Sequence, residues 1–320
     1  MVVAVLCFTA CGRHASQQKA SGDASPLPVV HFDADSAYHF VEEQVSMGPR
    51  VPGTEAHRRT ADYVVRQLAR FGADTIRQHG TAYRYDGQRI EMQNLIGIFN
   101  PQATRRIMLC AHWDSRPWAD QEADASAMHT PVPAANDGAS GVGILLEVAR
   151  QLGNTAPAIG VDIIMFDAED AGTPAFESYR HDENTWCLGS QYWARNPHKA
   201  GYRAQYAILL DMVGAEGATF PREYFSTQYA PGVVDKVWRI AAQLGYADMF
   251  VNRDSHPITD DHYFVNQLAH IPCIDIVHYD ADRGHGFFEQ WHTTHDDMSH
   301  ISRRTLAAVG HTLVTTLMSE

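Results

Sequence analysis

The sequence is poor in cysteine, in long apolar stretches and in positive charge, and each shortage removes a class of protein. It has five cysteines, and no two of them show the Cys-x-x-Cys spacing of a thiolate metal site. No stretch reaches the roughly 18 apolar residues that a transmembrane helix needs. Lysine and arginine total 25 against 38 aspartates and glutamates, a net charge of -13, which argues against binding to a nucleic-acid backbone. A negative field instead favours substrates that carry a free amine.

The rest of the composition is that of a globular protein. The chain has 320 residues, of which 45% are hydrophobic. No Pro/Gly-rich linker divides it after about residue 30, so we expect one domain over residues 31–320. Three cysteines remain in that region, Cys110, Cys187 and Cys273, and they are compatible with one disulfide or with simple buried thiols.

The first eleven residues differ from the remainder. Met1 to Ala10 is almost wholly apolar and leads to Cys11, which resembles the end of a bacterial lipoprotein signal, although a basic start is missing. The resemblance implies a lipid anchor at Cys11, export from a bacterial cell, and a periplasmic or membrane-anchored location. A frayed apolar terminus is the alternative. Residues 12–30 are polar and predict a tether between residues 1–11 and the folded part.

Strand and helix patterns alternate along the folded part. Apolar periodicity and turn residues predict helices over 54–71, 138–152, 232–244 and 302–318, and strands over 74–83, 90–99, 106–112, 161–166, 206–210 and 273–277. This alternation predicts an α/β fold, a three-layer sandwich with a mostly parallel, mixed central sheet and helices on both faces. Ligands of such sheets bind beyond the carboxyl ends of the strands. Acidic residues follow three predicted strands at that point, namely Asp114, Glu169 with Asp170, and Asp211.

Three distant segments carry residues that zinc prefers. They contain Asp137 before a glycine, Asp170 after a buried strand, and His292 in the run Trp291-His292-Thr293. Two carboxylates and an imidazole can form a three-ligand zinc site with an open fourth position. Glu169 directly precedes one proposed ligand, a suitable place for a general base. Taken singly, these segments also fit a helix cap, a solvated acidic loop and a surface histidine.

Six motifs in order resemble one enzyme family. They are Ala111-His112-Trp113-Asp114-Ser115-Arg116-Pro117, Asn136-Asp137-Gly138-Ala139-Ser140-Gly141, Glu169-Asp170, Leu210-Asp211, Asp260-Asp261-His262 and Trp291-His292-Thr293. Together they look like the animal-type (type II) glutaminyl cyclases, and bacterial members of that group most of all, within the zinc aminopeptidase superfamily. The resemblance runs from about residue 40 to the end.

The resemblance implies a zinc-exopeptidase-like fold and a role for each matching residue. Asp137, Asp170 and His292 match the ligands of a single zinc ion, and Glu169 matches the acid that moves the proton. Asp211 and Asp260 match two further acids of the active site, and Trp291 matches the tryptophan beside the ligand histidine, a substrate-binding position. The implied substrates are peptides and proteins with an N-terminal glutamine, which is cyclised to pyroglutamate with release of ammonia.

Two positions depart from the vertebrate pattern. Asp170 stands where vertebrate cyclases carry glutamate, so its loop must approach the metal more closely. Asp275 stands where they carry a histidine in the acid network. A second aspartate near Asp260 needs a shared proton or a different partner.

Two other functions fit parts of the same sequence. In a two-zinc aminopeptidase, Asp137 would bridge the metals, with His112 and Asp211 on one side and Asp170 and His292 on the other. A binding lipoprotein without catalysis is the second alternative, but such relatives usually lose the base or a ligand. The cyclase is favoured because Trp291 precedes His292 and because residues 112–118 resemble bacterial cyclases. Phe176 and Trp186, in the loop after Asp170, either line the substrate entrance or merely pack.

Overall fold

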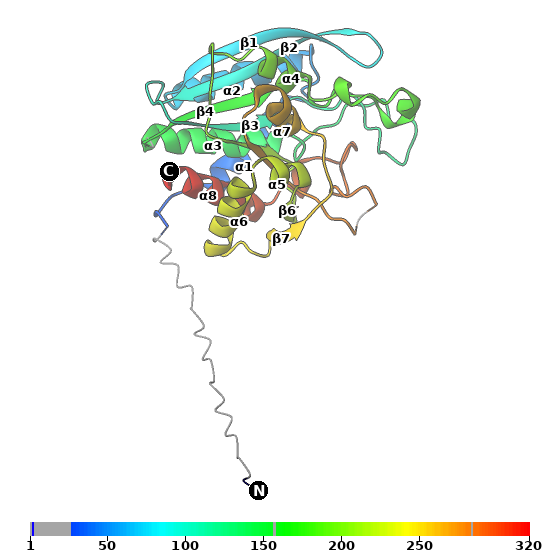
Figure 1. Ribbon diagram of the computed structural model, residues 1–320. Coiled ribbons are helices and arrows are strands. Elements are labelled where there is room, and N and C mark those ends of the chain that lie inside the picture. The colour runs from blue at the N-terminus through cyan, green and yellow to red at the C-terminus, as the bar shows by residue number, and fades with distance from the viewer. Residues whose placement is uncertain (1, 3–26, 156–157, 283) are drawn as a thin grey trace.

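The computed structural model describes residues 2, 27–155, 158–282 and 284–320 (Figure 1). The expected leader, its Cys11 and most of the expected tether therefore lie outside the described residues. The helices are α1 (Ala34–Ser46), α2 (Glu55–Arg70), α3 (Ala139–Asn154), α4 (Leu188–Arg195), α5 (Tyr224–Tyr229), α6 (Pro231–Gln243), α7 (Asp261–Phe264) and α8 (Arg303–Met318). The strands are β1 (Asp74–Tyr83), β2 (Arg89–Phe99), β3 (Arg106–His112), β4 (Gly160–Phe166), β5 (Ala207–Asp211), β6 (Phe220–Arg222), β7 (Phe250–Asp254) and β8 (Cys273–Val277).

The central sheet is mixed, as the sequence predicts. Its strand order is β1-β2-β4-β3-β5-β8. Strands β4, β3, β5 and β8 run parallel, whereas β1 and β2 pair antiparallel at one side. The four parallel strands therefore deliver their carboxyl ends to one edge, where ligands bind in α/β folds.

Side chains on the parallel strands alternate between two apolar cores. Leu109 belongs to the larger core, which α1, α2, α3, α6 and α8 also fill, whereas its neighbour Met108 belongs to the core beneath α4. Figure 1 shows α3, α1 and α8 on one side of the sheet and α4 and α7 on the other. The strands read as continuous apolar runs because both faces are covered. Each fully buried Ile or Leu contributes roughly 1.5–3 kcal/mol to folding.

The predicted helices and strands are confirmed, but several further elements were not expected. Thr54 caps α2 with its side-chain oxygen on the amide of His57, and Gly72 follows the helix with φ +88°. Helix α1, capped by Asp33, has no strong turn signal before it and was not expected, nor were α4, α5 and the β6–β7 pair. Among the described helices, none combines the length and apolarity that crossing a bilayer requires.

Candidate metal centre and active site

Asp137 lies in a tight turn directly before α3. The helix begins at Ala139 and its N-cap is Gly138, which makes no side-chain cap, so Asp137 is not the N-cap that its motif alone suggests. A Cβ added to Gly138 would stand 2.5 Å from His112 Nε2, so only glycine fits there. The turn is fixed from outside, because the carboxylate of Asp296 accepts the amides of Asn136 (2.8 Å) and Asp137 (3.1 Å).

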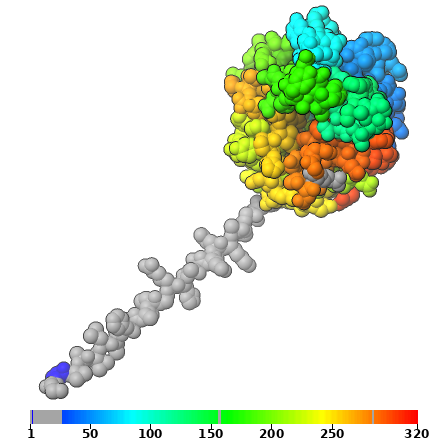
Figure 2. Space-filling view, turned by 90° about the vertical axis from the view of Figure 1, so that its right-hand side faces the viewer, coloured from blue at the N-terminus to red at the C-terminus, as the bar shows by residue number. Residues whose placement is uncertain are grey.

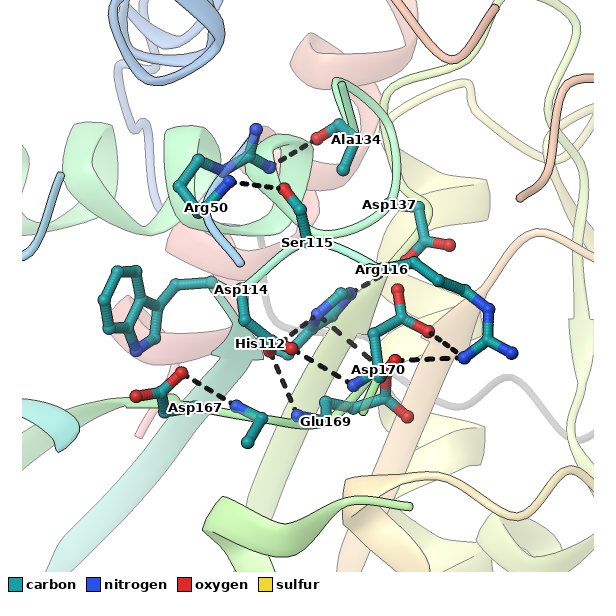
Figure 3. A network of polar contacts seen from close by, with 12 residues as sticks. Arg50, His112, Asp114, Ser115, Arg116, Ala134, Asp137, Asp167, Glu169 and Asp170 are labelled. Carbon is teal, nitrogen blue, oxygen red and sulfur yellow. Dashed lines mark hydrogen bonds and ion pairs between the residues drawn. The ribbon is translucent and has the colours of Figure 1, made fainter. Parts of the chain in front are cut away.

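Glu169 and Asp170 occupy the turn that follows β4. The carboxylate of Asp114, at the end of the neighbouring β3, accepts both of their amides, at 3.0 and 3.2 Å. Ala168 supplies the bend with φ 53°. Asp170 is 1% exposed, so this segment is not a solvated acidic loop. Figure 3 shows His112, Asp137, Glu169 and Asp170 gathered around this network.

His292 brings the third segment to the same place. Its Nε2 lies 3.2 Å from Oδ1 of Asp170 and 3.5 Å from Oδ2 of Asp137. Ligand atoms about 2.0–2.1 Å from a tetrahedral zinc ion are roughly 3.3 Å apart, which matches both separations. The other oxygen of Asp170 has no hydrogen-bond partner among the described residues although it is buried. The three side chains therefore fit a zinc ion, and His292 adopts φ 56° to reach this position.

A second group of polar atoms lies on the other side of Asp137. His112 Nε2 is 2.9 Å from Oδ1 of Asp137 and 3.3 Å from Oδ1 of Asp211. The 2.9 Å separation is that of a direct hydrogen bond and is shorter than the spacing of two zinc ligands. Burial lowers the pKa of His112, but hydrogen bonds to Asp114, Asp137 and Asp211 outweigh it and raise the pKa well above its usual value. His112 Nε2 is thus within hydrogen-bond distance of the Asp137 carboxylate.

A buried arginine supports the histidine from behind. Arg116 binds Asp120 through two hydrogen bonds of 2.8 and 2.6 Å, and Asp120 Oδ1 lies 3.3 Å from His292 Nδ1. Arg116 also donates to the carbonyl of Asp170 at 2.9 Å. Burial opposes ionisation of Asp120, but the hydrogen bonds from Arg116 and His292 hold its pKa below its usual range. A carboxylate on the far nitrogen of an imidazole fixes the ring for metal binding.

Glu169 faces the cavity beside these residues. Its side chain is 12% exposed, and the thiol of Cys187 donates to its Oε1 at 3.3 Å. Burial raises the pKa of Glu169 well above its usual value, and the neighbouring Asp170 carboxylate raises it further. A carboxyl group held in this way is suited to accept and return a proton near neutral pH.

A cavity of about 370 Å³ opens onto this site. Its wall combines acidic groups with aromatic and apolar ones, and includes Asp137, Glu169, Asp170, Asp211, Asp260, Trp186, Met212, Ile258, Tyr279, Phe287, Trp291 and His292. Trp291 stacks on His292 with ring centres 3.7 Å apart. On the face shown in Figure 2, the green segment 171–186 lies beside the blue-green segment 113–135.

All seven side chains proposed from the sequence lie on this one cavity. Of the two loop aromatics, Trp186 lines it, whereas Phe176 packs on Trp118 and His129 outside it. Asp120 and Cys187 were missed. Asp120 follows Arg116 by four residues in a non-helical loop. Neither Asp120 nor Cys187 stands in a short motif that points to the site.

Comparison with known proteins agrees with this geometry. Residues 94–317 match peptidase family M28. The chain is 49% identical to a glutaminyl cyclase from Bacteroides thetaiotaomicron bound to N-acetylhistamine, covering 92% of this chain and 100% of the other with a TM-score of 0.90. A Zn-dependent exopeptidase from Parabacteroides distasonis matches over the same shares at 48% identity and a TM-score of 0.90. The glutaminyl-peptide cyclotransferase of Bothrops jararaca is 25% identical over 294 residues, 80% of this chain and 73% of that protein. The chain therefore belongs to peptidase family M28, in which it is similar to bacterial glutaminyl cyclases along almost its whole length.

Proposed function

We propose that this protein is a glutaminyl-peptide cyclotransferase, which converts the N-terminal glutamine of peptides and proteins to pyroglutamate. One observation carries the proposal. His292 Nε2 lies 3.2 Å from Asp170 and 3.5 Å from Asp137, in a chain 49% identical to a glutaminyl cyclase. The cavity, of about 370 Å³, is large enough for the first residues of a peptide.

Asp137, Asp170 and His292 would hold one Zn²⁺ ion. When bound, the ion supplies a Lewis acid that polarises the side-chain amide of the substrate. Asp170 is one methylene shorter than the glutamate of vertebrate cyclases, and its turn is held against the site by Asp114 and Arg116. This support is what allows the shorter side chain to reach the metal.

Glu169 is the group that moves the proton. The α-amine attacks the side-chain amide carbon, forming a C–N bond within the same residue, while the bond to the amide nitrogen breaks. Glu169 accepts the proton that the amine loses and returns it to the departing nitrogen, which leaves as ammonia. The Cys187 thiol holds Oε1 of this carboxylate, so that Oε2 is the oxygen that exchanges the proton.

The other cavity residues hold the substrate in its folded-back shape. Asp211 and Asp260 present carboxylates to the nitrogen atoms, and Trp291 forms the wall beside His292. Because both reacting groups belong to one residue, fixing their relative orientation supplies much of the rate enhancement. Well-oriented groups reach effective molarities of roughly 10⁵ M or more.

The second candidate function is a two-zinc aminopeptidase. It draws support from one observation, the group of His112, Asp137 and Asp170 atoms within 4.8 Å of one another. The cyclase remains the stronger proposal because both the solved structure at 49% identity and the relative at 25% identity are glutaminyl cyclases.

Incubation with a Gln-initiated peptide separates the two functions. A cyclase releases ammonia and leaves a product lighter by that mass, whereas an aminopeptidase releases free glutamine. Peptides that begin with alanine remain intact in the first case and are shortened in the second.

We also propose that the protein is exported and anchored through a lipid on Cys11. The apolar run Met1–Ala10 before this cysteine supports the proposal. Labelled fatty acid supplied to cells should appear in the wild-type protein and be absent from the variant Cys11→Ser. Equal labelling of both would contradict the anchor.

A further inference from the structure

A group of buried acids lies directly behind the cavity wall. Asp260, at the start of α7, lines the cavity, whereas Asp275 in β8 and His262 in α7 lie beneath it and are fully buried. Ligand-type atoms of these three side chains lie within 4.8 Å of one another. Glu223, the N-cap of α5, contacts His262 and is the fourth member of the group.

Glu223 contacts His262 on the Nε2 side of its ring. That carboxylate accepts the amides of Phe225 (2.9 Å), Ser226 (2.7 Å) and Ile258 (3.1 Å), together with the hydroxyl of Ser226 (2.8 Å). Burial opposes its ionisation, but the hydrogen bond from His262 and the other donors hold the pKa of Glu223 below its usual value. The Glu223 carboxylate, which can only accept, forms a hydrogen bond with His262 Nε2, 3.0 Å away. Nδ1, on the opposite side of the ring, faces Asp275.

The carboxyl group of Asp275 has no donor within hydrogen-bond distance among the described residues. His262 Nδ1 lies 3.6 Å from its Oδ2, and a carboxylate oxygen of Asp260 lies within 4.8 Å of the Asp275 carboxyl. Neither oxygen of Asp275 has a hydrogen-bond partner among the described residues, although its backbone amide donates to the hydroxyl of Ser226. A buried carboxylate with no donor and no cation is strongly unfavourable, so the group must take up a proton.

Asp260 differs from Asp275 in having both access to the cavity and a hydrogen-bond donor. It opens onto the cavity, and its Oδ1 accepts the amide of Asp261 at 2.5 Å. Of two neighbouring acids, the one with a donor and solvent access ionises first. The neighbouring Asp261 is fully buried, and neither of its carboxylate oxygens has a hydrogen-bond partner among the described residues.

We propose that Asp275 is a neutral carboxylic acid, whose O–H is the donor that orients the ionised, cavity-lining Asp260 toward the substrate amine. This proposal rests on the proposed cyclase function and adds a positioning residue to it. Burial raises the pKa of Asp275 well above its usual value, and the charges of Asp260, Asp211 and Glu223 raise it further. Together with His262, these are the titratable groups that face Asp275 from α7, β5 and α5.

Two substitutions separate a proton donor from an ionised acid. Asp275→Asn keeps the shape, the neutral charge and an N–H donor, whereas Asp275→Leu keeps only the approximate volume. With a Gln-initiated peptide, we expect kcat/KM of Asp275→Asn to stay within about threefold of wild type and that of Asp275→Leu to fall about tenfold or more. Equal losses in both variants, or failure of Asp275→Asn to fold, would overturn the proposal.

A stability measurement decides the protonation without any assay of activity. The folded protein holds a proton on Asp275 that the unfolded chain releases above its ordinary pKa of about 3.9, so the stability of wild type falls as pH rises above that value. Asparagine removes this dependence. The melting temperature of Asp275→Asn relative to wild type should therefore rise steadily between pH 5 and pH 8.

Two results of that experiment would contradict a neutral Asp275. A variant that melts lower than wild type by the same amount at every pH would mean an ionised aspartate. A wild-type protein that holds one metal ion more than Asp275→Asn would mean that Asp260, His262 and Asp275 bind a cation. If wild type proves inactive on Gln-initiated peptides, the proposed function fails, but the melting data still decide the state of Asp275.

Discussion

Asp120 Oδ1 lies 3.3 Å from Nδ1 of His292, on the side of the ring that faces away from Asp137 and Asp170. Asp120 is itself bound by two hydrogen bonds to the buried Arg116. The imidazole is thus oriented from behind by an ion pair that no short motif encodes.

Replacing Asp120 should weaken metal binding without removing a ligand. Loss of a carboxylate behind a ligand histidine typically costs 10–100-fold in metal affinity. We expect a loss of about this size for Asp120→Asn, measured by competition with a zinc chelator. Asp124→Asn, at an exposed position of the same loop, is the control and should bind zinc as wild type does. Unchanged affinity in Asp120→Asn would show that His292 is positioned without it.

Glu169→Gln should separate chemistry from metal binding. The amide cannot accept the proton of the attacking amine, so turnover should fall by at least about 10²-fold while zinc remains bound. Steady-state assays and metal analysis of the same preparation measure both quantities. Glu183→Gln, which changes another glutamate of the cavity wall, should keep most of the activity. Zinc lost together with activity in Glu169→Gln would reassign Glu169 as a ligand.

We expect kcat/KM to fall at acidic pH because Asp260 becomes protonated. Burial raises the pKa of this carboxyl to about 6, and the charge of Asp211 contributes to the rise. Asp260 is therefore ionised above about pH 6 and takes up a proton as the pH falls through that value. Because the proposed role needs the ionised form, kcat/KM should decline tenfold per pH unit below this point. A profile that stays flat down to pH 4.5 would exclude that role.

Gly138→Ala should disturb the turn that presents Asp137. The new Cβ would stand 2.5 Å from both the Nε2 and the carbonyl oxygen of His112, so the ring or the turn must move. We expect a loss of about 1–3 kcal/mol in unfolding free energy together with weaker zinc binding. Gly232→Ala in α6, where nothing lies within 4 Å, is the matched control and should leave both quantities unchanged. A Gly138→Ala variant as stable as the control would mean that the turn is easily displaced.

The sequence predicted the sheet well because its signals are local. β3 contains the apolar run Ile107–Ala111, β8 is apolar apart from Asp275, and the predicted bounds of both agree with the structure. The short α4 and α5 were missed because tertiary packing, rather than a long periodic pattern, stabilises them. Cys187, for example, begins α4 in a left-handed conformation with φ 54° because its amide is held by the carbonyl of Glu169.

The site was predictable only where the chemistry sits in a short motif. Asp137, Asp170 and His292 stand next to glycine, a second acid and tryptophan, so their segments can be found without a structure. Asp296 carries no such signal, since its role depends on contact with a turn on the far side of the fold. The arrangement of Asp275, His262 and Glu223 likewise arises from three elements that meet only in the folded protein.

Native mass spectrometry of the purified protein tests the central claim most directly. The account predicts one zinc ion per chain in wild type, and none in His292→Ala, which should also fail to cyclise a Gln-initiated peptide. Two zinc ions per chain, or one ion retained by an active His292→Ala, would contradict it.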